Sequence, residues 1–226
     1  MDKVVRKVQR MPRIPAVRLG GMTDCFQPVE KRHQVTYHAI KALNEKRQPY
    51  LIVTKSSMVA DPEYLDLMDK DLAHIQVTMT CFDDEAYLSM DFERASLPSQ
   101  RRAAIEKLQE CGFDVSIRLS PLIPELFDLD AIAAVQCDKI LVEFLRVNSW
   151  IQKWFDIDYT DFTVKEAGYR HLPLGIKKKY IEALKPHFKE LTVCEDESIA
   201  YEYWRDNVNP NKNDCCNLRV AEAALF

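Results

Sequence analysis

Short apolar runs that alternate with helical segments constrain the fold of this chain more than any other feature. The runs are rich in β-branched residues and have the length of strands: residues 16–20, 50–54, 74–80, 114–119 and 139–144. Apolar residues recur at helical spacing between them, in segments near 28–43, 62–68, 98–111 and 129–135. Because each connection is long enough for a crossover, we expect parallel strands joined by right-handed βαβ units. The pattern therefore predicts an α/β protein.

Polar residues inside these strands bear on the shape of the sheet. Gln76 and Thr78 interrupt the third strand, Ser116 and Arg118 the fourth, and Glu143 the fifth. A parallel sheet covered on both faces has nearly continuous apolar strands instead. The polar positions favour a partial (β/α) barrel with a wet, ligand-facing interior, and an open, doubly covered sheet is the alternative.

The pattern changes after about Trp150. Residues 150–170 are rich in aromatic and acidic side chains without a clear period, and we interpret them as a packed excursion whose aromatics belong mostly to the core. A helix at 174–188, a sixth strand at 190–194 and a final helix at 198–207 are predicted to follow. We expect a basic N-terminal segment at 1–15, the barrel at 16–147, and a C-terminal helix-strand-helix extension at 148–226 packed on it.

Net charge, apolar content and cysteine spacing limit the partners, the location and the cysteine chemistry expected for this chain. The net charge of −4 gives no general attraction to nucleic acid, and the basic residues among the first thirteen are interpreted as a solvated face or frayed end. No stretch reaches the roughly 20 apolar residues of a membrane span, and no secretory signal is recognisable, so a cytoplasmic location is expected. Seven irregularly spaced cysteines predict reduced thiols rather than a disulfide framework.

Candidate ligand-binding residues lie at the carboxyl ends of the strands, where parallel α/β folds bind ligands. They are Gly20, Gly21, Met22, Thr23, Asp24, Lys55, Ser56, Thr80, Arg118 and Glu143. The double glycine is either a plain turn or a place where backbone approaches a ligand. Lys55 either clamps an anionic group or is solvated. Arg118 and Glu143 are interpreted first as an ion pair with each other and second as ligand contacts.

The cysteines near the C-terminus do not lead to a predicted metal site. Cys215 and Cys216, with Cys194 upstream, carry suitable ligand atoms, but adjacent cysteines seldom complete a good tetrahedral site together. No pair of histidines has a notable metal-ligand spacing. We therefore expect no metal site.

Three motifs resemble one known superfamily in their order along the chain. Residues 17–30 read VRLGGMTDCFQPVE, residues 52–56 read IVTKS, and residues 118–124 read RLSPLIP. They resemble the radical S-adenosylmethionine (SAM) superfamily, specifically its spore-photoproduct-lyase-like branch, over most of residues 16–147. The resemblance implies a partial barrel with SAM and a [4Fe–4S] cluster as cofactors, the cluster being held by three cysteines in C-x-x-x-C-x-x-C.

The resemblance also implies roles for individual residues. Gly20, Gly21 and Met22 would meet the amino group of SAM, and Thr23 stands where a polar residue reaches the ligand. Lys55 and Thr80 match positions that face the carboxylate and ribose side of SAM. Gly21 occupies the position of the cysteine hydrogen donor of the photoproduct lyases, so thymine-dimer repair is not expected.

The sequence departs from the superfamily at the cluster, because it contains no C-x-x-x-C-x-x-C and no other cysteine group replaces it. The first hypothesis is therefore a truncated or split radical SAM enzyme, inactive alone, whose cluster segment comes from another polypeptide. The alternative is a cluster-less barrel that binds nucleic acid or a protein partner. An open barrel edge also predicts self-association.

Overall fold

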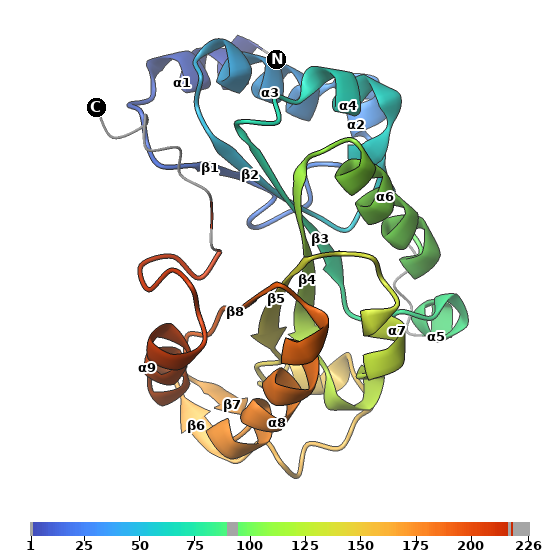
Figure 1. Cartoon of the computed structure of the whole chain (residues 1–226), viewed down its shortest axis with the longest axis vertical. Helices are drawn as coiled ribbons and strands as arrows, with labels where there is room; N and C mark the ends of the chain where they lie inside the picture. The colour runs from blue at the N-terminus through green and yellow to red at the C-terminus, as the bar shows by residue number, and fades with distance from the viewer. Residues whose placement is uncertain (1, 90–94, 217, 219–226) are drawn as a thin grey trace. The chain divides into compact units, whose positions relative to one another are not determined.

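The computed structural model describes residues 2–89, 95–216 and 218 of the chain. Strands and helices alternate through much of it, as the sequence predicts (Figure 1). The strands are β1 (Val17–Leu19), β2 (Tyr50–Thr54), β3 (Ala73–Met79), β4 (Asp114–Leu122), β5 (Lys139–Phe144), β6 (Val164–Glu166), β7 (Tyr169–His171) and β8 (Glu190–Val193). The α-helices are α1 (Asp2–Arg10), α2 (Glu30–His33), α3 (Val35–Glu45), α4 (Pro62–Leu67), α5 (Asp84–Ser89), α6 (Pro98–Glu110), α7 (Leu129–Ala133), α8 (Leu174–Leu184) and α9 (Ser198–Asn207).

Six of these strands form one sheet in the order β1-β2-β3-β4-β5-β8. The pairs β1 with β2, β2 with β3, β4 with β5 and β5 with β8 are parallel. The sheet is open, with β1 and β8 as its end strands. The predicted α/β fold with a partial barrel is therefore confirmed.

The chain divides into two compact units. The first unit comprises Met1–Thr78, Arg94–Ser116 and Leu218–Phe226, and the second comprises Met79–Glu93 and Ile117–Asn217. The boundary falls inside β3 and β4, so each unit contains part of those strands. The division into segments at 1–15, 16–147 and 148–226 stays a prediction.

The core of the first unit is built on β2 and β3, all of whose residues are buried. Local signals set the ends of its helices: Pro62 and Pro98 begin α4 and α6, where a missing backbone N–H costs nothing. The predicted helix at 28–43 is instead two helices, α2 and α3. Gln34 between them is left-handed, with φ of 50°, which ends the first helix.

The basic residues of the N-terminal segment are exposed, as expected for a solvated face, but the segment is folded rather than frayed. It forms α1, which packs against α3 and buries Val8 (Figure 1). The Lys46 ammonium donates to the carbonyls of Val8 at 3.1 Å and Gln9 at 3.3 Å. These carbonyls belong to the last turn of α1, where a cation is favourable. The basic residues therefore belong to a helix that is held against α3 by the buried Val8 and by the hydrogen bonds from Lys46.

The second unit packs helices and a hairpin around β5 and β8. Trp204 of α9 is buried and stacks on Phe144 of β5, with ring centroids 6.3 Å apart. The antiparallel pair β6 and β7 lies within and just after the irregular segment, and the sequence prediction missed it. Three-residue strands carry too little alternation to be recognised. Phe162 belongs to the core as expected, but Trp150 and Trp154 are exposed.

Among the described residues, no helix combines the length and the apolar character needed to cross a membrane.

Candidate functional site

The loop that follows β1, residues 20–24, is called here the glycine loop. Its first residue must be glycine, because Gly20 has φ of +86° and a Cβ there would lie 2.1 Å from the Val53 carbonyl oxygen. Gly21 has no such restriction, since the nearest atom to a Cβ there is in the Arg18 side chain at 3.5 Å. The loop therefore approaches the backbone of β2 closely at Gly20, the first glycine of the pair.

Asp24 fixes the other end of the glycine loop. Its Oδ1 accepts hydrogen bonds from the Thr54 hydroxyl and from the Phe26 N–H, both at 2.8 Å. Its Oδ2 accepts the Lys55 N–H at 2.6 Å. The carboxylate is therefore used within the protein, and it ties the loop to the carboxyl end of β2.

The middle of the glycine loop is open. Gly21, Met22 and Thr23 are exposed, and the Met22 side chain is 99% exposed. Among the described residues, no backbone hydrogen bond involves the peptide groups of these three residues. Peptide groups held at a fixed place with no internal partner are suited to a polar ligand.

Lys55 and Ser56 follow β2 beside this loop. Lys55 is exposed, and its N–H is the group that Asp24 accepts. The Ser56 hydroxyl accepts the Met58 N–H at 3.3 Å and caps the short 3₁₀ helix η1 (Ser57–Ala60). Ser56 therefore caps η1. Lys55 lies beside the glycine loop, to which its backbone N–H is bonded through Asp24.

Cys25 lies directly after the glycine loop but is a poor ligand. Burial raises the pKa of the Cys25 thiol to about 12, and the nearby Asp24 carboxylate adds to this effect. Metal binding needs the thiolate, so the environment disfavours coordination by Cys25.

The other predicted residues belong to the second unit and contact one another there. Arg118 of β4 donates to Glu143 of β5 at 2.6 Å, which confirms the predicted ion pair. The Ser120 hydroxyl donates to the same Glu143 oxygen at 2.8 Å, and the Thr80 hydroxyl donates to the Ser120 carbonyl at 2.9 Å. Burial alone would lower the pKa of Arg118, but Glu143, with smaller effects of Cys194 and Cys216, raises it.

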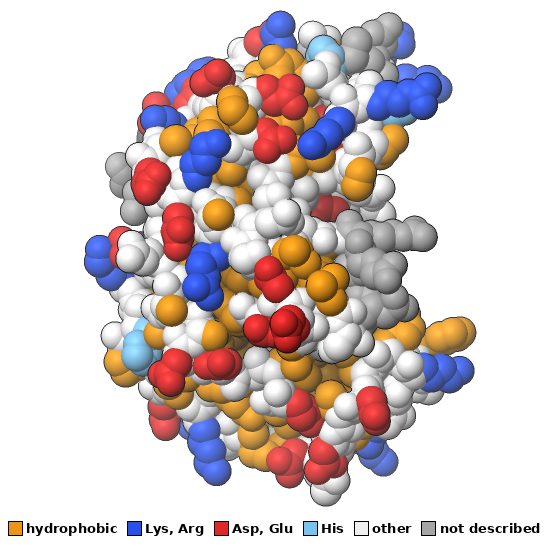
Figure 2. Space-filling model, turned by 90° about the vertical axis from the view of Figure 1, so that its right-hand side faces the viewer, with side chains coloured by type: hydrophobic (Ala, Val, Ile, Leu, Met, Phe, Trp, Pro, Cys, Tyr) orange, Lys and Arg blue, Asp and Glu red, His pale blue; other side chains and the backbone are white. Residues whose placement is uncertain are grey.

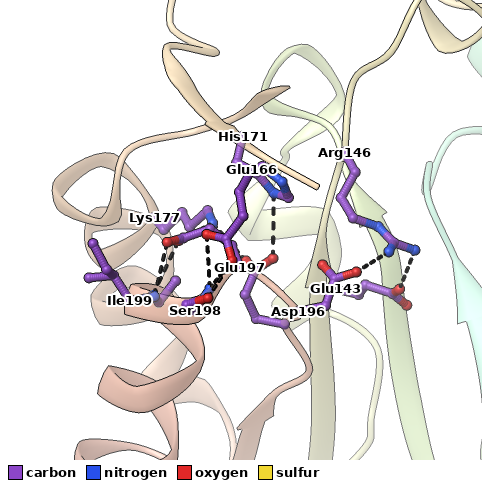
Figure 3. Close-up of polar contacts among 11 residues, drawn as sticks. Glu143, Arg146, Glu166, His171, Lys177, Asp196, Glu197, Ser198 and Ile199 are labelled. Atoms are coloured by element: carbon purple, nitrogen blue, oxygen red, sulfur yellow. Dashed lines mark hydrogen bonds and ion pairs between the residues drawn. The ribbon is translucent and has the colours of Figure 1, made fainter. Parts of the chain in front are cut away.

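Arg146 extends this network toward the segment after β8. Its guanidinium lies 3.8 Å from Glu143 and also bonds Asp196 (Figure 3). Arg146 follows β5 and Asp196 follows β8. Their ion pair therefore connects the carboxyl ends of these two strands within the second unit.

A buried charge cluster, formed by Lys177, Glu195, Glu197 and His171, was missed by sequence reasoning. The Lys177 ammonium bonds Glu195 at 2.7 Å and lies 3.5 Å from Glu197, and all three side chains are buried. His171 lies 3.8 Å from Glu195. One signal was present: Lys177 stands at helical spacing from Ile181 and Leu184, which are the buried positions of α8. A lysine on the buried face of a helix requires buried carboxylates as partners.

Comparison with known proteins gives sequence relatives of uncharacterised function. No family model matches the chain. It is 31% identical over 117 residues to the uncharacterized protein MJ0683 of Methanocaldococcus jannaschii, which covers 51% of this chain and 44% of the relative. It is 27% identical over 165 residues to the uncharacterized protein Rv2578c of Mycobacterium tuberculosis, covering 67% and 48%. The chain thus spans less than half the length of these relatives.

Solved structures give a more specific result. Spore photoproduct lyase, complexed with dinucleoside spore photoproduct, matches 84% of this chain and 64% of its own with a TM-score of 0.57 at 14% identity. SuiB of Streptococcus suis matches 94% of this chain and 47% of its own, at a TM-score of 0.54 and 11% identity. A radical SAM methyltransferase from Sphaerobacter thermophilus matches 85% and 53% at 0.50 and 13% identity. The fold is that of the radical SAM enzymes.

The radical SAM fold implies an iron–sulfur cluster, and the cysteines of this chain do not fit it. They stand at positions 25, 81, 111, 137, 194, 215 and 216, so no three have the spacing C-x-x-x-C-x-x-C. Cys25, the cysteine next to the glycine loop, is kept protonated by its surroundings. The glycine loop does fit SAM, because it presents exposed peptide groups at the end of a strand. The assignment of individual residues to SAM stays a prediction.

Proposed function

We propose that this chain is the SAM-binding barrel part of a radical SAM enzyme of the spore-photoproduct-lyase-like kind, and that it is inactive alone. The observation that carries the proposal is the glycine loop, which Gly20 and Asp24 hold against β2 while its middle stays open. A radical SAM fold gives this loop its context. The cluster that completes such a site would come from a polypeptide bearing C-x-x-x-C-x-x-C.

The proposal gives the residues of the first unit distinct roles. Carbonyl groups of Gly20 to Met22 accept hydrogen bonds from the SAM ammonium, and the Thr23 hydroxyl contacts the ligand. The Lys55 ammonium pairs with the SAM carboxylate, as a point charge suits an anion. Asp24 is a positioning residue, because its oxygens bond the protein. SAM supplies the radical chemistry only when a reduced cluster accompanies it.

The polar residues of the second unit have a different role in the proposal. Arg118 and Glu143 are proposed to be structural, since each bonds the other and Ser120 reinforces the pair. A cytoplasmic location is part of the proposal and rests on composition.

Genomic context and reconstitution together test the proposal. The coding sequence immediately upstream, or a neighbouring gene, should encode a C-x-x-x-C-x-x-C polypeptide, and its absence would sink the split-enzyme hypothesis. With that polypeptide bound and its cluster reconstituted, calorimetry should show SAM binding. Lys55→Gln should weaken it by at least about tenfold, the scale of a lost ion pair. Lys41→Gln, on the exposed face of α3, should leave it unchanged.

One observation favours a second candidate, a binding module. Trp150 and Trp154 are 65% and 68% exposed, and the Lys153 ammonium lies 5.0 Å from the Trp150 ring centroid. Exposed aromatics beside a cation are suited to stacking on single-stranded nucleic acid. On the face shown in Figure 2, Lys and Arg side chains are interspersed with Asp and Glu side chains and do not form a single basic patch. Titration with labelled single strands separates the candidates: a salt-dependent affinity lost in Trp150→Ala would favour this one.

Self-association is also part of the proposal. Among the described strands, β1 pairs with β2 alone and forms one end of the sheet, and such edges invite pairing. Arg18 is exposed on this strand, which limits that tendency. Light scattering should find dimers or larger species for the chain alone, and a monodisperse monomer would contradict the expectation.

A further inference from the structure

Three cysteines from separate parts of the sequence meet at the carboxyl end of β8. Cys194 directly follows the strand, and its N–H bonds the Val142 carbonyl of β5 at 2.9 Å. The Cys215 thiol, from the loop after α9, donates to the Cys194 sulfur at 3.1 Å. Cys216 stands next to Cys215, and all three are partly buried. We call these three residues the thiol cluster.

A carboxylate accompanies the thiol cluster. The ligand atoms of Asp214, Cys215 and Cys216 all lie within 4.8 Å of one another. Asp214 Oδ1 accepts the Cys216 N–H at 2.9 Å, which holds the carboxylate beside the sulfurs of Cys215 and Cys216. Three sulfurs and one carboxylate are a donor set that binds borderline-soft divalent metals.

The surroundings of the thiol cluster include a buried cation, the guanidinium of Arg118. Arg118 is close enough for Cys194 and Cys216 to act electrostatically on it. A buried guanidinium beside sulfurs offsets the negative charge that thiolate ligands bring.

We propose that Cys194, Cys215 and Cys216 bind a zinc ion, with the Asp214 carboxylate as the fourth ligand. Each thiol releases its proton to solvent as the zinc–sulfur bond forms, and no electron is transferred. Bonds of about 2.3 Å in a tetrahedral site place two sulfurs about 3.8 Å apart. The Cys194 and Cys215 sulfurs are 3.1 Å apart in the structure, so they would have to move apart by less than about 1 Å. Side-chain rotation can supply a movement of this size.

Adjacent cysteines alone make a poor tetrahedral site. Here the other two ligands come from the end of β8, which supplies Cys194, and from the loop after α9, which supplies Asp214. A second group of ligand type, His171 with Glu195 and Asp196, is a weaker candidate. The Lys177 ammonium already bonds Glu195 at 2.7 Å there, and a cation in that position repels a metal ion.

Cobalt(II) tests the proposal with the full chain, kept reduced and free of oxygen. Titration should produce a thiolate-to-cobalt charge-transfer band that saturates at one cobalt per chain, and zinc should abolish it. Cys194→Ser, Cys215→Ser and Cys216→Ser should each weaken cobalt binding by at least about tenfold, the scale expected for perturbing one metal contact. Cys111→Ser is the matched control, since Cys111 is also partly buried but lies at the end of α6, in the first unit.

A second readout guards against variants that fold poorly. Zinc should raise the melting temperature of the natural chain and of the Cys111→Ser variant, but not that of a variant lacking all three cluster thiols. The proposal is overturned if the natural chain shows no charge-transfer band, or if the band persists unchanged in Cys194→Ser and Cys215→Ser. Neither readout involves SAM or an iron–sulfur cluster, so the result is independent of the proposed function.

Discussion

The Asp24 carboxylate and the Thr54 hydroxyl are joined by a hydrogen bond of 2.8 Å that connects the loop after β1 to the last residue of β2. The same carboxylate accepts the backbone N–H of the following residue, Lys55. A side chain that accepts three hydrogen bonds from the protein orders its neighbours rather than a ligand. The open part of the loop is therefore held at a fixed place without using its own peptide groups.

Removing the Asp24 carboxylate should loosen this connection. Asp24→Ala should lower the free energy of unfolding by about 1–3 kcal/mol, because the Thr54 hydroxyl and two backbone N–H groups lose their acceptor. Asp24→Asn keeps one acceptor oxygen and should cost less. Urea denaturation measures both. Asp66→Asn, at an exposed position of α4, is the control and should have little effect.

The two glycines of the loop should respond differently to alanine. Gly20→Ala should destabilise the protein by about 2–4 kcal/mol, since φ is positive and a Cβ meets the Val53 carbonyl oxygen. Gly21→Ala should change stability by less than about 1 kcal/mol. Thermal unfolding of the two variants compares them directly. Equal effects would contradict the close approach at Gly20.

The Arg118–Glu143 pair should behave as a buried ion pair. Arg118→Met leaves the Glu143 carboxylate with the more distant Arg146 guanidinium, at 3.8 Å, and the Ser120 hydroxyl as partners, and should cost about 1–3 kcal/mol of unfolding free energy. The double variant Arg118→Met with Glu143→Leu should cost less than Arg118→Met alone. A double-mutant cycle from urea denaturation supplies the coupling. Additive costs would argue that the two residues do not depend on each other.

Cys25 should give stability an alkaline dependence. Its pKa is raised from 9.0 to about 12 in the folded protein, so the unfolded chain loses this proton first as pH rises. Its contribution to stability is complete below pH 9 and declines between pH 9 and 12, with a slope of up to about 1.4 kcal/mol per pH unit. Subtracting the Cys25→Ala unfolding free energy from that of the natural chain isolates this decline. A difference that stays constant with pH would show that Cys25 is not desolvated.

Sequence reasoning found the fold because its evidence is periodic. The runs that became β2 and β3 are apolar, β-branched and bounded by turn residues, and Pro98 marks the start of α6 as expected. The pairing of Arg118 with Glu143 was also predictable, since a charge inside an apolar strand needs a partner.

What the sequence could not show depends on which distant segments meet. The role of Asp24 requires knowing that its loop lies beside Thr54, thirty residues later. The thiol cluster requires Cys215 to return to the end of β8, beside Cys194. Such contacts leave no periodic signal, because they are set by the path of a loop rather than by a repeating pattern.

The central claim is that this chain supplies a SAM-binding barrel and another polypeptide supplies the cluster. The most direct measurement is the release of 5′-deoxyadenosine from SAM under anaerobic, reducing conditions after reconstitution with iron and sulfide. The account predicts no release from this chain alone, and release when the C-x-x-x-C-x-x-C polypeptide encoded beside it is added. Release by this chain alone, or none from the mixture, would contradict the account.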